Sequence, residues 1–229
     1  MKTAGIIGGI APESTIAYYR EIVKQYLQHT EGKSYPRVII NSIDMNRMLS
    51  FIPGNLPDLV DYMCAEIDKL KAAGADFAVL ASNTPHIAFN EINKKSSLPL
   101  LSIVELACRK VKSLGYNKAG LFGTKSTMSN HFYQDVFAVH NISIIVPADE
   151  EQEYINKVYF GELVKGIFLP ETKQKLLQIV ESMHKQYDIP AVILGGTELP
   201  LILKDGDSPD TALLDTTLIH VEGIIKELI

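Results

Sequence analysis

Residues 77–86 read FAVLASNTPH, an apolar run that ends in a turn of small and hydroxyl-bearing side chains. A short continuous apolar run is typical of a strand that is buried on both faces, as in a parallel sheet. Similar runs recur at residues 5–7, 37–40, 98–103, 119–122, 142–146 and 191–194. Segments with helical spacing lie between them, at residues 14–28, 56–73, 104–114, 126–140, 150–161, 171–186 and 216–228. This alternation predicts an α/β fold with mostly parallel sheets.

Three more of the predicted strands end in turns of the same kind, at residues 8–9 (GG), 123–127 (GTKST) and 195–198 (GGTE). This weak internal repeat predicts two copies of one unit, each near half of the chain. We therefore expect two pseudo-symmetric lobes, each a mostly parallel sheet flanked by helices. The N-terminal lobe would comprise residues 1–103 plus 211–229, with the last helix returning to it, and the C-terminal lobe residues 104–210.

The amino-acid composition and charge argue against some classes of binding partner. The chain has 229 residues, of which 46% are hydrophobic, so it can bury a sizeable core. Its net charge of −5, from 22 basic and 27 acidic residues, argues against a nucleic-acid partner, which would need a basic face. No run approaches the roughly 20 apolar residues that span a bilayer. Because there are only two cysteines and no N-terminal secretory signal, we expect a cytoplasmic protein without a membrane partner.

The strand-end turns are the candidate ligand site. In open parallel sheets, ligands bind beyond the carboxyl ends of the strands. Free backbone N–H groups, hydroxyls and helix N-termini at that edge suit a carboxylate or a phosphate. The turn at Gly8 and Gly9 lacks the spacing of a dinucleotide-binding loop. The six histidines lack metal-ligand spacing, so we expect no metal, and we expect Cys64 and Cys108 to be buried small hydrophobes.

Over nearly the whole chain, these turns resemble those of the aspartate/glutamate racemase family. Residues 5–10 (GIIGGI), followed by residues 13–15 (EST), look like the family's opening strand and loop. Residues 82–86 (SNTPH) stand where the family typically has Cys-Asn-Thr-x-His, and residues 195–198 where it has Gly-Cys-Thr-Glu. Asp215 and Thr216 resemble the pair before its last helix. The resemblance implies a site in the cleft between the two lobes, no cofactor and a homodimer.

Two positions depart from the family pattern. The mechanism implied by the resemblance uses two cysteines, one that removes the Cα proton and one that delivers a proton to the opposite face. Ser82 and Gly196 stand at those two catalytic positions. A serine hydroxyl is too weak a base unless another group activates it, and glycine has no acid or base. Racemisation by two thiols is therefore not possible with these residues.

The substrate-binding positions match the family better. Arg47 stands where aspartate-specific members have an arginine for a substrate carboxylate, and Lys165 resembles their second cationic contact. An arginine binds a carboxylate through two N–H groups and a lysine acts as a point charge, so together they could hold a dicarboxylate. The alternative is two solvated surface cations. The resemblance implies further substrate contacts from Gly9, Asn83, Thr84, Thr124, Thr197 and Glu198.

The expected ligand is an acidic amino acid or a related dicarboxylate, and its fate stays open at this point. An isomerase would need a neighbour that activates Ser82, or His86 or Glu198 acting as a base. A one-base enzyme such as a decarboxylase would need chemistry on one face only. A binding or regulatory pseudoenzyme would keep the site without turnover. Deliberate replacement of both thiols to trap a substrate is the remaining alternative.

Overall fold

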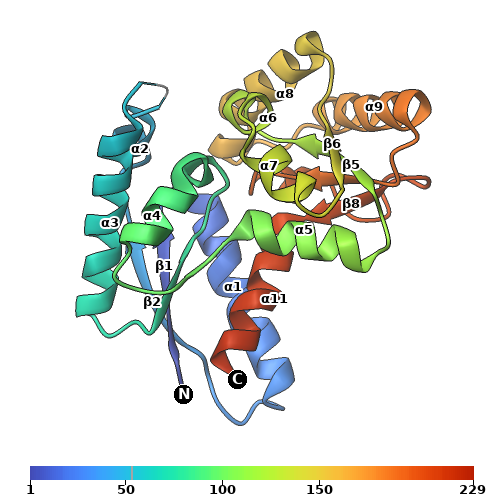
Figure 1. The fold of residues 1–229 in the computed structure, drawn as a ribbon. Coiled ribbons are helices and arrows are strands. Elements are labelled where there is room, and N and C mark those ends of the chain that lie inside the picture. The colour runs from blue at the N-terminus through green and yellow to red at the C-terminus, as the bar shows by residue number, and fades with distance from the viewer. Residues whose placement is uncertain (53) are drawn as a thin grey trace. The chain divides into compact units, whose positions relative to one another are not determined.

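The computed structural model describes residues 1–52 and 54–229, which form two compact units (Figure 1). Unit 1 comprises residues 1–103 and 220–229, and unit 2 comprises residues 104–219. Each contains a four-stranded parallel sheet, in the order β2-β1-β3-β4 in unit 1 and β6-β5-β7-β8 in unit 2. The two sheets therefore have the same strand order, with β5 to β8 in the places of β1 to β4. The predicted α/β fold of two similar halves is thus confirmed.

The sheet of unit 1 has β1 and β3 at its centre. Its strands are β1 (Thr3–Gly8), β2 (Arg37–Ser42), β3 (Phe77–Leu80) and β4 (Leu100–Leu101). All pairs are parallel, with Ile6 opposite both Ile40 on β2 and Val79 on β3. β1 and β3 are buried along their whole length, as their continuous apolar sequence predicts.

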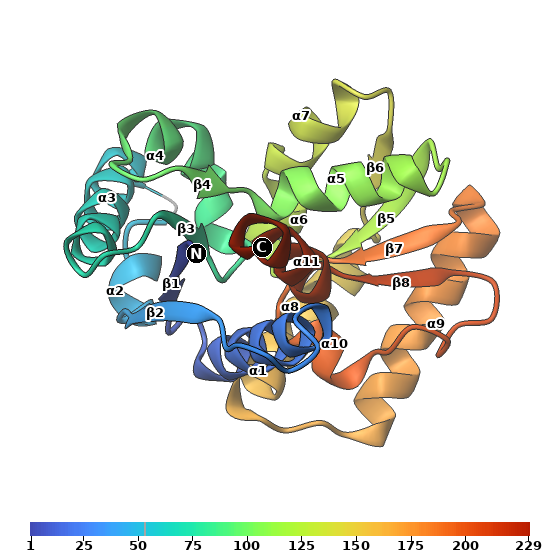
Figure 2. The same cartoon turned by 90° about the horizontal axis from the view of Figure 1, so that it is seen from below.

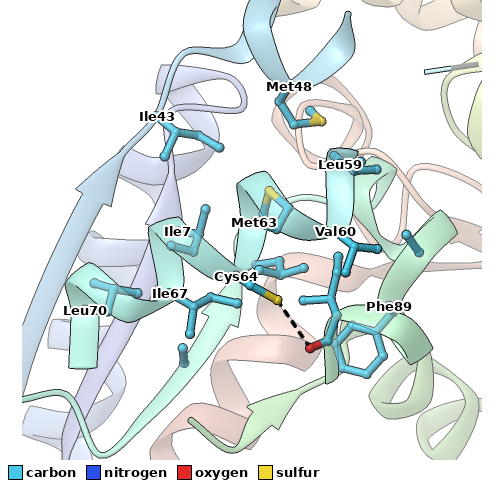
Figure 3. Packing of buried hydrophobic residues seen from close by; sticks show 14 of the residues in the cluster. Ile7, Ile43, Met48, Leu59, Val60, Met63, Cys64, Ile67, Leu70 and Phe89 are labelled. Atoms are coloured by element: carbon cyan, nitrogen blue, oxygen red, sulfur yellow. Dashed lines mark hydrogen bonds between the residues drawn. The ribbon is translucent and has the colours of Figure 1, made fainter. Parts of the chain in front are cut away.

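Helices cover both faces of this sheet. They are α1 (Pro12–His29), α3 (Leu56–Ala72), α4 (Phe89–Lys95) and α11 (Thr216–Leu228), with the short elements α2 (Met45–Leu49) and η1 (Thr84–Ala88). Successive residues of a strand point to opposite faces. Ile6 accordingly packs in one cluster with residues of α1 and α11, and Ile7 in another with residues of α3 and α4. Figure 3 shows the second cluster.

Cys64 belongs to the α3 cluster, where it behaves as a small hydrophobe. Its thiol donates a weak hydrogen bond to the carbonyl of Ile92, with Sγ 3.8 Å from the oxygen (Figure 3). Cys108, in unit 2, makes a similar contact at 4.0 Å with the carbonyl of Val136. Burial raises the pKa of both thiols, so both stay protonated near neutral pH. The prediction that both cysteines are buried is confirmed.

Unit 2 repeats the arrangement. Its strands are β5 (Lys118–Phe122), β6 (Ser143–Ile145), β7 (Ala191–Leu194) and β8 (Ala212–Asp215). Its helices are α5 (Ile103–Ser113), α6 (Lys125–Ser129), α7 (Phe132–Ala138), α8 (Asp149–Gly161), η2 (Leu163–Lys165), α9 (Pro170–Tyr187) and α10 (Leu199–Ile202). Residues of α8 and α9 pack with Val192 and Leu194 of β7. Figure 2 shows α9 and α5 on opposite sides of this sheet.

The sequence prediction placed residues 211–229 in the first lobe, and the structure differs for residues 211–219. The reason is β8, which was not among the predicted strands. It pairs with β7 from Ala191 opposite Ala212 to Leu194 opposite Asp215, and this ladder holds the segment in unit 2. The chain returns to unit 1 at His220 instead, inside α11.

Two other predicted elements are shorter than expected. The helix predicted at residues 126–140 is divided into α6 and α7, because Asn130 adopts an extended backbone at the end of α6. The Asn130 side chain donates to the carbonyl of Ser126 at 2.7 Å, which ends that helix locally. The strand predicted at residues 98–103 shrinks to β4, since α5 already begins at Ile103. Among the described residues, no helix is long and apolar enough to cross a membrane.

The C-terminal part of α11 is fixed to unit 1 by a buried histidine. His220 donates from Nε2 to the carbonyl of Leu101 at 3.1 Å, so its Nδ1 accepts the hydrogen bond from the Tyr18 hydroxyl at 2.8 Å. Tyr18 lies on α1, and the two rings meet edge to face, with their centroids 5.7 Å apart. Burial lowers the pKa of His220 to about 4, so this imidazole is neutral near pH 7.

Candidate functional site

In unit 1, three strand ends bring the predicted site residues to one edge of the sheet. The N–H of Ile43, just after β2, donates to the carbonyl of Gly8 at the end of β1, with a length of 2.9 Å. The N–H of Ala81, just after β3, donates to the carbonyl of Ile7 at 2.9 Å. These bonds align the turn at Gly9, the start of α2 and the turn that begins at Ser82. Parallel pairing therefore gathers the three segments, as the sequence predicted.

Gly9 allows the tight turn from β1 into α1. Its φ is +82°, a value that favours glycine, and a Cβ there would lie 2.4 Å from the carbonyl oxygen of Ile43. Its N–H donates to the Thr15 hydroxyl at 2.8 Å. The geometry thus gives Gly9 a backbone role, and its use as a substrate contact stays a prediction.

Arg47 lies on α2, whose first turn is capped by Asp44. The Asp44 carboxylate accepts from the N–H groups of Asn46 at 2.8 Å and Arg47 at 3.2 Å. The Arg47 side chain is exposed, and its guanidinium carbon lies 5.1 Å from the centre of the Tyr62 ring, a cation–π contact. The ion pairs within 4.0 Å among residues 1–52 and 54–229 do not include Arg47. Its guanidinium is therefore oriented by an aromatic face, and its charge also helps to lower the pKa of the Glu66 carboxyl.

The turn after β3 is buried: Ser82, Asn83 and Thr84 all have little exposed surface. His86, which follows them on η1, is fully engaged by the backbone. The Ile103 N–H donates to its Nε2 at 3.3 Å, so its Nδ1 carries the proton and donates to the carbonyl of Ser82 at 3.0 Å. The ring also stacks on Phe89, with centroids 4.8 Å apart.

His86 is therefore a structural group. Burial, with a smaller contribution from the nearby His220, lowers its pKa to about 3. Both of its nitrogens bind backbone groups, and its contact with Ser82 is to the carbonyl and not to the hydroxyl. The hypothesis that His86 acts as a base, directly or by activating Ser82, is not supported by this geometry. Instead, His86 fixes the Ser82 turn to the start of α5.

In unit 2, the turns after β5 and β7 lie together, because the N–H of Gly195 donates to the carbonyl of Phe122 at 2.7 Å. Thr124 caps α6: its hydroxyl accepts from the Thr127 N–H at 3.2 Å and shares a hydrogen bond with the Thr127 hydroxyl at 3.1 Å. The Thr124 side chain thus has a local structural role. Its expected contact with a substrate stays a prediction.

The turn after β7 contains a buried carboxylate held by two hydroxyls. The Thr197 hydroxyl donates to Oε2 of Glu198 at 3.0 Å. The phenol of Tyr159, on α8, donates to the same oxygen. Burial, and next the charge of Glu198, raise the pKa of Tyr159 well above its usual value, so the phenol stays protonated. The buried Glu198 carboxylate is thus held by two hydroxyl donors on one oxygen.

Sequence reasoning missed Tyr159. Within residues 150–161 it follows Ile155 and Val158 on the apolar face of the helix, so it looks like an ordinary core residue. The structure shows that its ring lies against Gly196, where a Cβ would be 2.5 Å from Cε2 of Tyr159. Position 196 therefore has neither a side chain nor space for one beside this ring.

The pair Asp215 and Thr216 begins α11. The Thr216 hydroxyl donates to the carbonyl of Leu194 at the end of β7, at 2.7 Å. The Asp215 carboxylate accepts from the N–H groups of Thr217 at 2.7 Å and Leu218 at 3.1 Å. These contacts attach the first turn of α11 to the same edge of the sheet. In the part of the chain that the structure describes, no three His, Cys, Asp or Glu side chains are grouped to hold a metal ion.

Lys165 ends η2, which packs against α10 just after Glu198. Its side chain is exposed, and Gly166 follows in the left-handed conformation with φ of +72°.

Of the site residues, the structure brings Thr197 and Glu198 into direct contact with each other, and Glu198 into contact with Tyr159. Arg47 lies in unit 1 and Lys165 in unit 2.

Two repeated parallel α/β units, with hydroxyl-rich turns at the carboxyl ends of their strands, define a class of small-ligand proteins. Within this class, the chain belongs to the Asp/Glu/Hydantoin racemase family, whose sequence model matches residues 7–224. It is similar to the broad specificity amino-acid racemase RacX of Bacillus subtilis (strain 168). That protein is 27% identical over 208 residues, which cover 87% of this chain and 86% of RacX.

Solved structures agree with this assignment. An aspartate racemase homologue from Pyrococcus horikoshii OT3 is 32% identical, with a TM-score of 0.87 over 100% of this chain and 99% of its own. The aspartate racemase of Picrophilus torridus is 21% identical, with a TM-score of 0.75 over 100% of this chain and 94% of its own. At that lower identity, the likeness concerns the fold alone.

The hydrogen bond from Tyr159 to Glu198 predicts a measurable loss of stability. Tyr159→Phe keeps the ring and removes one donor from a buried carboxylate. We expect the free energy of unfolding, measured by urea denaturation, to fall by about 1.5–3 kcal/mol. The matched control is Tyr19→Phe, whose side chain is half exposed on α1 and whose effect should stay within about 0.5 kcal/mol. Equal effects of the two substitutions would contradict this role of the phenol.

The two buried histidines predict that acid destabilises the fold. An unfolded histidine titrates near pH 6.5, whereas His86 and His220 have native pKa values of about 3 and about 4. Below pH 6.5 the unfolded chain thus binds more protons, so stability falls as the pH falls. Each histidine contributes a slope of up to about 1.4 kcal/mol per pH unit between pH 6.5 and pH 5.

Urea unfolding at a series of pH values measures this slope. His220→Gln should reduce it, and His29→Gln, at an exposed position on α1, should leave it unchanged. A free energy of unfolding that is flat between pH 6.5 and pH 5 would show that the two imidazoles are not held neutral.

Proposed function

We propose that this racemase-family protein binds an acidic amino acid or a related dicarboxylate, and that it does not racemise its ligand by a two-thiol mechanism. Family membership supports a small amino-acid ligand. The hydroxyl-rich turns of both units supply groups that bind carboxylates. The homodimeric state and the cytoplasmic location expected from the sequence remain predictions.

The observation that carries this proposal is the environment of positions 82 and 196. Removal of a Cα proton requires a positioned base, and delivery of a proton requires a positioned acid. Gly196 supplies neither, and the adjacent ring of Tyr159 leaves no space for a replacement. Ser82 has a hydroxyl, but the histidine of its own turn is neutral and bound to the backbone.

A one-base enzyme, such as a decarboxylase, is less well supported. It would need Ser82 or Glu198 to take or hold a proton. Ser82 receives no activation from His86. Glu198 Oε2 already accepts hydrogen bonds from Tyr159 and Thr197, so this oxygen is engaged within the protein. These contacts favour binding over turnover.

In this proposal, the cationic side chains recognise the ligand's carboxylates. Arg47 would bind one carboxylate through two N–H groups, in the orientation that the Tyr62 ring imposes. Lys165 would act as a point charge on a second carboxylate. Asn83, Thr84 and Thr197, together with the backbone near Gly9, would supply neutral donors. Each of these contacts is a hypothesis for the experiments below.

The first test combines binding with isotope exchange. The purified protein is incubated in D2O with L- and D-aspartate and with L- and D-glutamate, and the ligand signals are followed by NMR. We expect broadened ligand lines without deuterium at Cα, because neither Ser82 nor Gly196 supplies a thiol to exchange that proton. Incorporation of deuterium would overturn the non-racemising part of the proposal. Sharp lines for all four ligands would overturn the acidic amino acid as the ligand class.

The second test reverses one charge. Arg47→Glu replaces a bidentate donor with a repelling carboxylate, so the affinity for the ligand that broadens should fall at least about 10- to 100-fold. Calorimetric titration measures this change. The matched control is Arg20→Glu on the exposed face of α1, for which we expect unchanged affinity. An Arg47→Glu protein that binds as well as the control would remove Arg47 from the site.

A further inference from the structure

We propose that Tyr159 and Gly196 are a coupled pair, in which the Tyr159 ring occupies the volume that any side chain at position 196 would need. In the racemase family, that position is where the resemblance places a catalytic thiol. Tyr159 would thus be the residue that determines which chemistry this turn can support. The coupling itself requires no ligand, and its consequence for the bound amino acid rests on the proposed function.

The first argument is steric. An ideal Cβ on Gly196 would lie 2.5 Å from Cε2 of Tyr159 and 3.1 Å from both Cζ and the hydroxyl oxygen. Carbon atoms that are not bonded to each other prefer separations of about 3.5–4.0 Å. Even an alanine at position 196 would therefore require the ring to move.

The second argument is that the ring is held in place. Tyr159 is only 7% exposed and packs in the same buried cluster as Val158, Leu194 and Leu199. Its hydroxyl is hydrogen-bonded to Glu198, two residues beyond Gly196. Because the ring is packed along its body and bound at its tip, it cannot swing aside as the end of an exposed side chain would.

The third argument concerns the backbone. Gly9 needs to be glycine because of its positive φ, but Gly196 is not among the glycines with positive φ. Its backbone conformation is open to other residues, so the turn itself does not demand glycine. Among the atoms within 4 Å of its ideal Cβ, the three nearest all belong to Tyr159. Tyr159 therefore supplies the reason for glycine at this position.

The chemical consequence of the pair is that this turn carries the phenol of Tyr159 in place of a thiol. A thiol at position 196 would be an exchangeable acid with a pKa that proteins can bring near neutrality. The phenol that stands there is a neutral donor, and its proton is already directed to Glu198. The pair thus replaces a proton-transfer group with a fixed hydrogen-bond donor, in agreement with a binding site.

A double-mutant cycle tests the coupling by urea unfolding of the full chain. We expect Gly196→Ala alone to increase the unfolding equilibrium constant at least about tenfold. In the Tyr159→Leu background, which removes the atoms nearest the new Cβ, the same substitution should change that constant less than about threefold. In the Tyr159→Phe background the ring remains, so the full effect should persist. This third background separates ring volume from the lost hydrogen bond.

Gly161→Ala is the matched control, because a Cβ on this glycine at the end of α8 would meet no atom within 4 Å. It should not increase the unfolding constant in any background. An effect of Gly196→Ala that is the same with Tyr159 and with Leu at position 159 would overturn the coupling. If Gly196→Ala alone does not fold, Tyr159→Leu should restore folding, and failure to restore it would also overturn the coupling.

A gain-of-function arm then connects the pair to chemistry. Ser82→Cys with Gly196→Cys is compared in D2O, in the presence of aspartate, with and without Tyr159→Leu. We expect Cα deuterium exchange only in the triple variant, where the second thiol has space. Exchange at an equal rate in the double variant would overturn the blocking role of Tyr159. A positive stability cycle, with neither exchange nor binding of aspartate, would support the pair and contradict the proposed ligand.

Discussion

Parallel pairing of strands that are buried on both faces is the constraint on which the rest of each unit depends. Ile6 lies between Ile40 and Val79 in one sheet, and Leu121 lies opposite Ile193 in the other. Because both faces of such strands are apolar, helices must cover both, and only the ends of the strands are left to meet a ligand. The polar turns of each unit are consequently gathered at one edge of its sheet. That edge contains both Ser82 and Gly196 in their respective units, the positions on which the proposed function rests.

The two strand-end turns that resemble the family's cysteine sites have different surroundings. In unit 1, Ser82 stands where the resemblance implies a thiol, and His86 binds backbone groups through both ring nitrogens. In unit 2, the side chain is absent and an aromatic ring from α8 takes its volume. The first change alters the strength of a base, and the second removes the position at which a base could stand. The proposed function, binding without two-thiol racemisation, accounts for both.

Buried polar groups in this protein serve mainly to hold turns and helix ends. His220 ties α11 to β4 and to α1 through the Leu101 carbonyl and the Tyr18 hydroxyl. Thr216 ties the start of α11 to β7, and Thr197 and Tyr159 hold Glu198. Since a buried polar group without a partner costs stability, each of these contacts also fixes the local geometry. A ligand site built on such turns is preorganised before the ligand arrives.

The sequence by itself determined the α/β class, the two similar halves and the strand-end turns. Continuous apolar runs, helical spacing and hydroxyl-rich turns are local patterns, and burial on both faces requires them. It also predicted that Ser82 and Gly196 stand at the family's catalytic positions, because the neighbouring residues resemble the family motifs, and this stays a prediction. The prediction of buried cysteines succeeded for the same reason, since Cys64 lies on the apolar face of its helix.

Only the tertiary structure decided which residues meet across the chain. The pairing of β8 with β7 assigned residues 211–219 to unit 2, although the apolar run at residues 212–214 is only three residues long. The structure also showed that both ring nitrogens of His86 bind backbone groups. The contact of Tyr159 with Gly196 joins residues far apart in sequence, and neither residue is unusual in its own segment. Such contacts depend on how side chains pack between elements, which local periodicity does not specify.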